Sequence, residues 1–279
     1  MILNVLLDFL GQPHRPKTIF DKFLQIEGSV TKTGQQTQGY VYIPGKREDR
    51  VLLVAHADTV LSLSDTKAPE IIIKNNNIIT NKHGGVLGAD DRAGCAILWL
   101  LKDSGHSILV LDGEESGMAG SRWLMSDKDI ADIVNSHNFV VQLDKSGENE
   151  FKCYNVGSPE FIQYVQESTG YIPLPNTSYT DIVTLCRDIC GVNFSVGYFN
   201  EHTDREELNI DFWLKTYFTI KFWLEKPQKK FVLERANSYS CLFGDFGDEF
   251  DCSSDQAFSR LEKYFHNLDL AQKEGAKNG

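Results

Sequence analysis

Residues 107–115 read SILVLDGEE, a continuous apolar run that ends in two adjacent glutamates, Glu114 and Glu115. A short apolar run without polar alternation is typical of a strand that is buried on both faces of a sheet. Two like charges side by side cost free energy unless a cation or a proton lies between them. The stretch therefore predicts a buried strand whose carboxyl end can hold a cation, if other ligands lie nearby.

Strand-like and helix-like stretches alternate on either side of this run. Their succession favours an α/β fold: a three-layer α/β/α domain with a mixed, largely parallel central sheet and helices on both faces. The asparagines in EIIIKNNNIITNK predict a hairpin over residues 70–82. The expected strands are residues 38–44, 50–58, 106–115, 139–147 and 192–202, and the expected helices are residues 91–105, 121–136, 159–170 and 205–226.

The composition excludes several classes of protein. The chain has 279 residues, of which 41% are hydrophobic, enough for a sizeable core. A net charge of -11 without a Lys/Arg cluster argues against a nucleic-acid partner. No stretch has membrane-spanning length, and the apolar start lacks the flanks of a signal peptide, so no membrane association is expected. Sparse cysteines indicate a cytoplasmic protein and small buried side chains rather than disulfides: Cys95, Cys153, Cys186, Cys190, Cys241 and Cys252.

Residues 1–279 are expected to form a single catalytic domain, because no repeat, low-complexity tract or Pro/Gly-rich linker divides the chain. The tail differs in composition. Residues 246–279 begin with an acidic, irregular segment and continue with apolar positions at helical spacing. We expect this helix to dock on the domain, with docking on a partner as the alternative.

Polar residues gather where the expected strands end. In open α/β sheets, ligand sites lie at the carboxyl ends of the strands. Taken singly, each residue has an ordinary explanation, such as a helix N-cap for an aspartate or a solvated face for paired glutamates. Their joint appearance points to a metal site instead. The residues are His56 and Asp58, Glu114 and Glu115, Asp144, His202, and Asp90 with Asp91 just ahead of a helix.

Metal chemistry accounts for this set. Two zinc ions about 3.5–4 Å apart need a bridging carboxylate and further histidine or carboxylate ligands. Asp90 is suited to bridge. One glutamate of the pair can bind metal while the other carries protons, and the cations make the second negative charge tolerable. Asp58, two residues after His56, is placed to accept the other ring N–H and fix the tautomer of the imidazole.

The order of these motifs resembles the co-catalytic di-zinc exopeptidases, which include zinc aminopeptidases, peptidase T-like tripeptidases and related deacylases. The matching stretches span residues 50–210: VAHADTV, NNNIITNKHGGVLGADDRAG, LDGEESGMAGS, VQLDKSG and NEHTDREEL. The resemblance implies that His56, Asp90 and Asp144 hold one zinc ion and that Asp90, Glu115 and His202 hold the other. It also implies that Glu114 is the general base and that the Asp90–Asp91 peptide bond is cis.

Other features of the resemblance leave alternatives open. The stretches between His56 and Asp90 and between Asp144 and His202 are too short for an inserted lid or dimerisation domain, so a bare catalytic domain is expected. Asp181, in SYTDIVTL, either supports the site or caps a helix. His83 either lines the cleft or lies in an ordinary loop. The donor to the oxyanion is unassigned, with Tyr171, Tyr179 and Tyr198 as candidates.

The activity expected from this pattern is hydrolysis of a terminal peptide bond by a chain that binds two zinc ions, with cobalt or manganese as possible substitutes. An aminopeptidase acting on small peptides is preferred, because an acidic rim can hold an ammonium group. An N-acyl-amino-acid deacylase or a carboxypeptidase would share the metal site. A catalytically inactive binding protein is disfavoured by the complete ligand set. A monomer or small homo-oligomer is expected.

Overall fold

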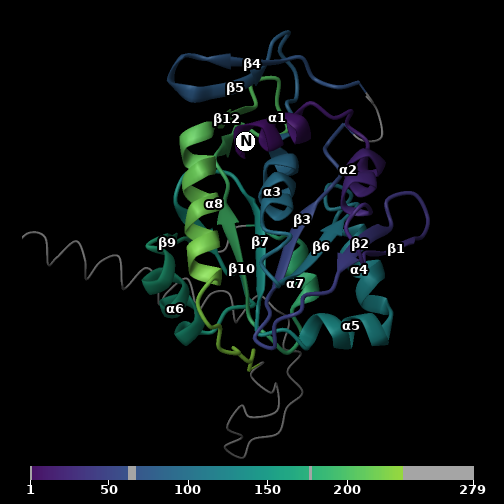
Figure 1. Cartoon of the computed structure of the whole chain (residues 1–279), viewed down its shortest axis with the longest axis vertical. Helices are drawn as coiled ribbons and strands as arrows, with labels where there is room; N and C mark the ends of the chain where they lie inside the picture. Colours follow the sequence, from purple (N-terminus) through teal and green to yellow (C-terminus); the bar gives the residue numbers. More distant parts are fainter. Residues whose placement is uncertain (1, 62–66, 176–177, 235–279) are drawn as a thin grey trace, which may run out of the picture. The chain divides into compact units, whose positions relative to one another are not determined.

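Eight strands form the central sheet of the protein, which a computed structural model describes for residues 2–61, 67–175 and 178–234 (Figure 1). Neighbouring strands β6, β3, β7 and β10 are parallel, whereas β1 and β2 add at one edge in antiparallel fashion. The predicted mixed, largely parallel sheet is confirmed. The order is β1 (Val30–Thr33), β2 (Gly39–Ile43), β6 (Ser107–Leu111), β3 (Leu52–His56), β7 (Val140–Lys145), β10 (Gly191–Ser195), β8 (Glu150–Lys152) and β9 (Ile172–Pro173).

Helices cover both faces of this sheet, as three layers require. Successive residues of β3 alternate between the faces, so Leu53 packs in one core cluster and Val54 in the other. The first face carries α1 (Ile2–Leu10), α2 (Pro16–Phe23), α3 (Ala89–Leu100), α6 (Pro159–Thr169) and α8 (Ile210–Leu224). The second face carries α4 (Ala119–Ser126), α5 (Lys128–Asn135) and α7 (Asp181–Leu185).

A second, four-stranded sheet contains the predicted asparagine hairpin. Its order is β11 (Tyr198–Phe199), β12 (Glu207–Asn209), β5 (Ile78–Asn81) and β4 (Ile71–Lys74), with the short helix η1 (Asn75–Asn77) at the hairpin turn. All its pairings are antiparallel. Because the chain passes from β10 of the main sheet directly into β11, the small sheet positions the turn that follows β11.

Three expected elements each combine two elements that are separate in the structure. Residues 192–202 are not one strand, because β10 ends at Ser195 and Gly197 takes a φ of 90°, which turns the chain into β11. Residues 205–226 begin with β12 before α8 starts. Residues 121–136 form two helices, because Asp127 caps the second one by accepting hydrogen bonds from the backbone N–H groups of Asp129 and Ile130.

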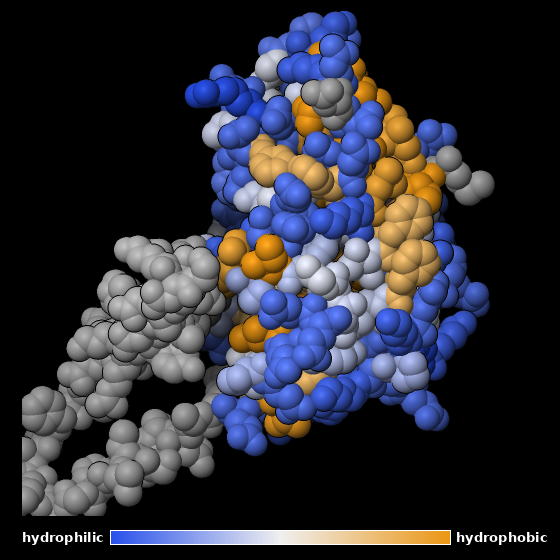
Figure 2. Space-filling model, turned by 90° about the vertical axis from the view of Figure 1, so that its left-hand side faces the viewer, coloured by the Kyte–Doolittle hydropathy of each residue, from blue (hydrophilic) through white to orange (hydrophobic). Residues whose placement is uncertain are grey.

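Helix α8 carries apolar side chains on two sides, of which one is buried and the other is partly exposed. Trp213, Ile220 and Trp223 are buried against the sheet. The rings of Phe218 and Phe222 stack 5.9 Å apart on the outer side, where they are 37% and 55% exposed. Figure 2 views the molecule from the side on which α8 lies and shows apolar residues in orange among polar residues in blue.

The remaining sequence-based expectations have simple outcomes. Cys95, Cys153, Cys186 and Cys190 are buried, as expected. Across the described ranges, no helix has the length and apolar character needed to cross a membrane. The expected acidic segment and helix of residues 246–279 lie outside the described residues.

Candidate metal centre

Two groups of potential ligands meet at the carboxyl edge of the central sheet. The first group is His56, at the end of β3, with Asp144 in β7 and Asp90 at the start of α3. The second group is Asp90 again, with Glu115 after β6 and His202 between β11 and β12. In each group, the potential ligand atoms lie within 4.8 Å of one another. The structure therefore brings together all five residues expected to bind metal.

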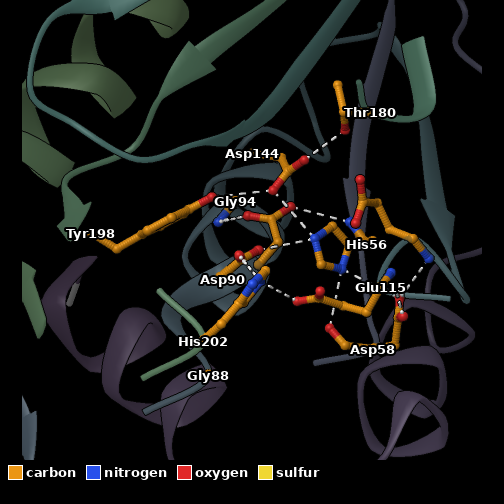
Figure 3. A network of polar contacts seen from close by, with 12 residues as sticks. His56, Asp58, Gly88, Asp90, Gly94, Glu115, Asp144, Thr180, Tyr198 and His202 are labelled. Carbon is orange, nitrogen blue, oxygen red and sulfur yellow. Dashed lines mark hydrogen bonds and ion pairs between the residues drawn. The ribbon is translucent and has the colours of Figure 1, made fainter. Parts of the chain in front are cut away.

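Asp90 belongs to both groups and presents one carboxylate oxygen to each (Figure 3). Its Oδ1 lies 3.1 Å from His56 Nε2, and its Oδ2 lies 3.0 Å from His202 Nε2. Asp144 Oδ1 lies 3.2 Å from His56 Nε2, and Glu115 Oε1 lies 2.9 Å from His202 Nε2. This is the arrangement that a carboxylate bridging two cations requires.

Asp58 holds the imidazole of His56 in place, as its spacing suggested. His56 Nδ1 lies 3.1 Å from the backbone oxygen of Asp58 and 3.3 Å from its Oδ1. With a proton on Nδ1, Nε2 is left to face Asp90 and Asp144. The Asp58 carboxylate also accepts the backbone N–H groups of Glu114 and Glu115, at 3.2 and 3.1 Å. One buried carboxylate therefore ties the glutamate pair to the histidine.

Asp144 is fixed by hydrogen bonds to both of its oxygens. Its Oδ2 accepts from Gln142 Nε2 at 2.9 Å and from the Thr180 hydroxyl at 2.8 Å. Its Oδ1 accepts from the Tyr198 hydroxyl at 3.2 Å.

Of the three tyrosines considered as donors to the oxyanion, Tyr198 donates its hydroxyl to the Asp144 side chain and is therefore not free to reach a substrate. Of the other tyrosines considered, Tyr171 contacts Thr216, and Tyr179 is 62% exposed.

The start of α3 adds a residue whose contribution the sequence did not reveal. The Asp90–Asp91 peptide bond is cis, as the resemblance implied. The buried Asp91 carboxylate accepts the backbone N–H groups of His56 at 3.1 Å and Gly94 at 3.0 Å, which joins β3 to α3. A Cβ atom at Gly94 would lie 2.0 Å from the Leu143 backbone oxygen, so only glycine fits there.

When no metal is bound, protons can reduce the negative charge that these side chains concentrate in one place. Burial, followed by the negative charge of Asp144, raises the pKa of Glu114 to about 9. The Asp90 and Glu115 carboxylates beside it raise the pKa of His202 to about 11. Burial also raises the pKa of Asp144 to about 6. The raised pKa of Glu114 indicates that its negative charge is costly unless positive charge lies beside it.

We expect the stability of the metal-free protein to fall as the pH rises from about 5 to about 9. For Glu114, the folded pKa of about 9 exceeds the ordinary 4.5, so the folded state binds more protons between these values. For His202, the stabilisation is complete below its ordinary pKa of 6.5 and is lost toward about 11. Thermal unfolding of chelated protein across this range measures the effect, with zinc-loaded protein as control. A melting temperature that rises with pH would contradict it.

The residues present fit a pair of divalent metal ions. Each group supplies one imidazole nitrogen and carboxylate oxygens, the donors that zinc, cobalt and manganese share. Glu115 Oε1 is buried and makes no aligned hydrogen bond, although His202 Nε2 lies 2.9 Å away. An ion bound beside both atoms would satisfy this buried oxygen.

Two further residues from the sequence can now be located. Asp181 is buried and begins α7, where Thr180 occupies the N-cap position. Burial raises the pKa of Asp181 to about 7. Its support of the site stays a prediction. His83 is exposed and pairs with Glu70 at 2.7 Å, which fits the ordinary loop reading.

The fold and the two ligand groups define an α/β protein with a candidate two-metal centre at the sheet edge. No protein-family model and no curated protein matches the chain. Among solved structures, a tripeptidase from Staphylococcus aureus matches with a TM-score of 0.62 and 15% identity, over 80% of this chain and 97% of that one. Aminopeptidase PepT from Bacillus cereus matches with a TM-score of 0.58 and 14% identity, over 80% and 97% of the two chains.

An archaeal protein also has a similar structure. An aminopeptidase from Desulfurococcus kamchatkensis matches with a TM-score of 0.57 and 12% identity, over 81% of this chain and 95% of that one. At such identities the likeness establishes the fold. The chain has the three-layer α/β fold of these tripeptidases and aminopeptidases, so the resemblance in the sequence is confirmed at that level.

Proposed function

We propose that this protein is a zinc-dependent exopeptidase that cleaves terminal peptide bonds, an aminopeptidase acting on small peptides. The observation that carries the proposal is Asp90, whose two oxygens face two separate groups of potential ligands. His56, Asp90 and Asp144 would hold one ion, and Asp90, Glu115 and His202 the other. The complete ligand set and the free Glu114 weigh against an inactive binding protein.

When bound, the metal ions would polarise the scissile carbonyl and lower the pKa of the attacking water. Glu114 would take a proton from that water and return it to the leaving amine. Two features suit Glu114 to this role. It is absent from both ligand groups, and its backbone N–H is anchored to the Asp58 carboxylate.

The other side chains would position the reacting groups. Asp58 would orient His56 through Nδ1, and Thr180, Gln142 and Tyr198 would hold Asp144 in place. Such outer partners sharpen the geometry of a metal site and tune its affinity. We include Asp58 among the functional residues for this reason, although it touches the ligand and not the substrate.

The substrate assignment rests on the acidic character of the site and on the names of the structural neighbours, a tripeptidase and aminopeptidases. An N-acyl-amino-acid deacylase or a carboxypeptidase would use the same ligands.

The TET1 peptidase of Pyrococcus horikoshii is described as assembling into a tetrahedron or a large octahedral shell. For the present chain we propose a single catalytic domain over residues 1–279 and a monomer or small homo-oligomer.

We expect purified protein to contain two divalent ions per chain and to hydrolyse small peptides that have a free amino terminus. A strong chelator should abolish this activity, and zinc, cobalt or manganese should restore it, because a bridging carboxylate serves two ions. Metal analysis combined with aminoacyl, carboxy-terminal and N-acyl reporter substrates tests the proposal. One ion or fewer per active chain would refute the two-metal centre. Turnover of N-acylated or carboxy-terminal substrates alone would replace the aminopeptidase assignment with one of the alternatives.

A further inference from the structure

Glu206 is a buried carboxylate outside both ligand groups, four residues after His202. Its exposed fraction is 1%. Its Oε2 accepts the backbone N–H groups of Leu87 at 2.8 Å and Gly88 at 2.9 Å, and its Oε1 accepts the N–H of Asp90 at 3.1 Å. All three contacts therefore go to the backbone that leads into the bridging aspartate.

The backbone ahead of the bridging aspartate needs such a partner from elsewhere in the chain. Asp90 and Asp91 have non-helical backbone angles, and the Asp91 carboxylate accepts the Gly94 N–H and so caps the regular part of α3. The N–H groups of Leu87, Gly88 and Asp90 lie before that cap, and buried N–H groups require an acceptor. Gly88 has a φ of 73°, and a Cβ atom there would lie 2.8 Å from the ring of His14 and 3.2 Å from Thr59, so no side chain at this position could supply one.

The same carboxylate belongs to the segment that carries His202. The backbone N–H of Glu206 donates to Thr203, and the N–H of Gly85 donates to Asp204, so residues 202–206 pack against the loop before α3. The side chain of His202 is 47% exposed, so burial alone does not hold it in place. The distance between His202 and Asp90 is therefore set largely by how these two segments are joined.

The two ligands that belong to the first group alone are held by different contacts. His56 and Asp144 extend from neighbouring strands β3 and β7, and Asp58, Gln142 and Thr180 fix their side chains. The loss of the Glu206 contacts would leave these contacts intact. Asp90 belongs to both groups, but only the second group has two members, Asp90 and His202, in the segments that Glu206 joins, so a disturbance at Glu206 should act mainly on the second group.

We propose that Glu206 is a positioning residue that joins the His202 turn to the start of α3 and so sets the affinity of the second metal ion. The proposal rests on the two-metal centre of the proposed function. It predicts that the binding affinities of the two ions depend differently on Glu206. A carboxylate that served only to stabilise the fold would affect both ions alike.

Glu206→Gln tests this asymmetry. Glutamine offers one acceptor oxygen in place of two and turns an NH₂ group toward backbone donors. Titration of metal-free protein with zinc against a competing chelator should show the first ion bound nearly as tightly as in the wild type. The second ion should bind about 10–100-fold more weakly, the usual cost of losing an outer partner of a metal site. Excess zinc should then restore peptidase activity.

Two other variants make the result decisive. Glu206→Asp keeps the charge but is too short to reach all three N–H groups, and it should weaken mainly the second ion, by a smaller factor than Glu206→Gln. Asp127→Asn, the matched control, alters a carboxylate that accepts two backbone N–H groups at the start of α5 and should leave both affinities unchanged. Equal weakening of both ions in the Glu206 variants, or no weakening, would overturn the proposal. A wild-type protein that binds a single ion would instead refute the two-metal centre, and this inference with it.

Discussion

Glu114→Gln is expected to lower kcat by roughly 10²–10⁴-fold, the range that general acid–base catalysis contributes. Glutamine keeps the shape of the side chain but cannot accept a proton from water. The backbone contact of Glu114 with Asp58 does not involve its carboxyl group, and Glu114 belongs to neither ligand group. The fold and the bound metal should therefore persist. Steady-state kinetics and metal analysis of the same preparation measure both properties.

Glu115→Gln is the matched control, because it makes the same chemical change one residue away. Glu115 Oε1 lies 2.9 Å from His202 Nε2 within the second ligand group, so this variant should lose metal first and activity as a consequence. Added zinc should rescue Glu115→Gln in part and Glu114→Gln not at all. Near-normal turnover by Glu114→Gln, or metal loss confined to it, would require the two roles to be exchanged or the mechanism abandoned.

The sequence predicted the parts of the fold that local pattern determines. The apolar runs that became β3 and β6 are buried along their whole length, so their composition alone marks them as central strands. Elements that depend on a single backbone turn were misjudged. Gly197 separates β10 from β11, and apolar residues on both sides made the two read as one strand. The split between α4 and α5 at Asp127 was hidden in the same way by helical periodicity on both sides.

The residues of the candidate site likewise fall into those that the sequence predicted and those that it missed. His56, Asp90, Asp144 and the glutamate pair were predictable because each follows a strand or precedes a helix that the sequence pattern marks. Glu206 was missed because its partners, the N–H groups of Leu87, Gly88 and Asp90, are backbone atoms more than a hundred positions away. A carboxylate that binds backbone leaves no complementary side chain in the sequence. His202 was placed just beyond a single strand, whereas it lies in a turn of the second sheet.

Asp90→Asn is expected to weaken the binding of at least one metal ion by more than about 100-fold, since the loss of an outer partner alone costs about 10–100-fold. The amide oxygen can serve one group, but the NH₂ group cannot serve the other. His56 would keep Asp144 and His202 would keep Glu115, which leaves two protein ligands in the group that loses the oxygen. Peptidase activity at ordinary zinc concentrations should fall below detection. Zinc titration and metal analysis of the purified variant measure the loss.

Asp91→Asn provides the comparison that separates a bridging role from a structural one. Asp91 is as deeply buried as its neighbour, but its oxygens accept only backbone N–H groups, from His56 and Gly94. Its replacement should lower the free energy of unfolding by about 1–3 kcal/mol, the cost of an unsatisfied buried group, and leave two ions bound at saturating zinc. If Asp90→Asn still bound two ions with near-normal affinity, Asp90 could not be the bridge. The two ligand groups would then have to act as independent sites.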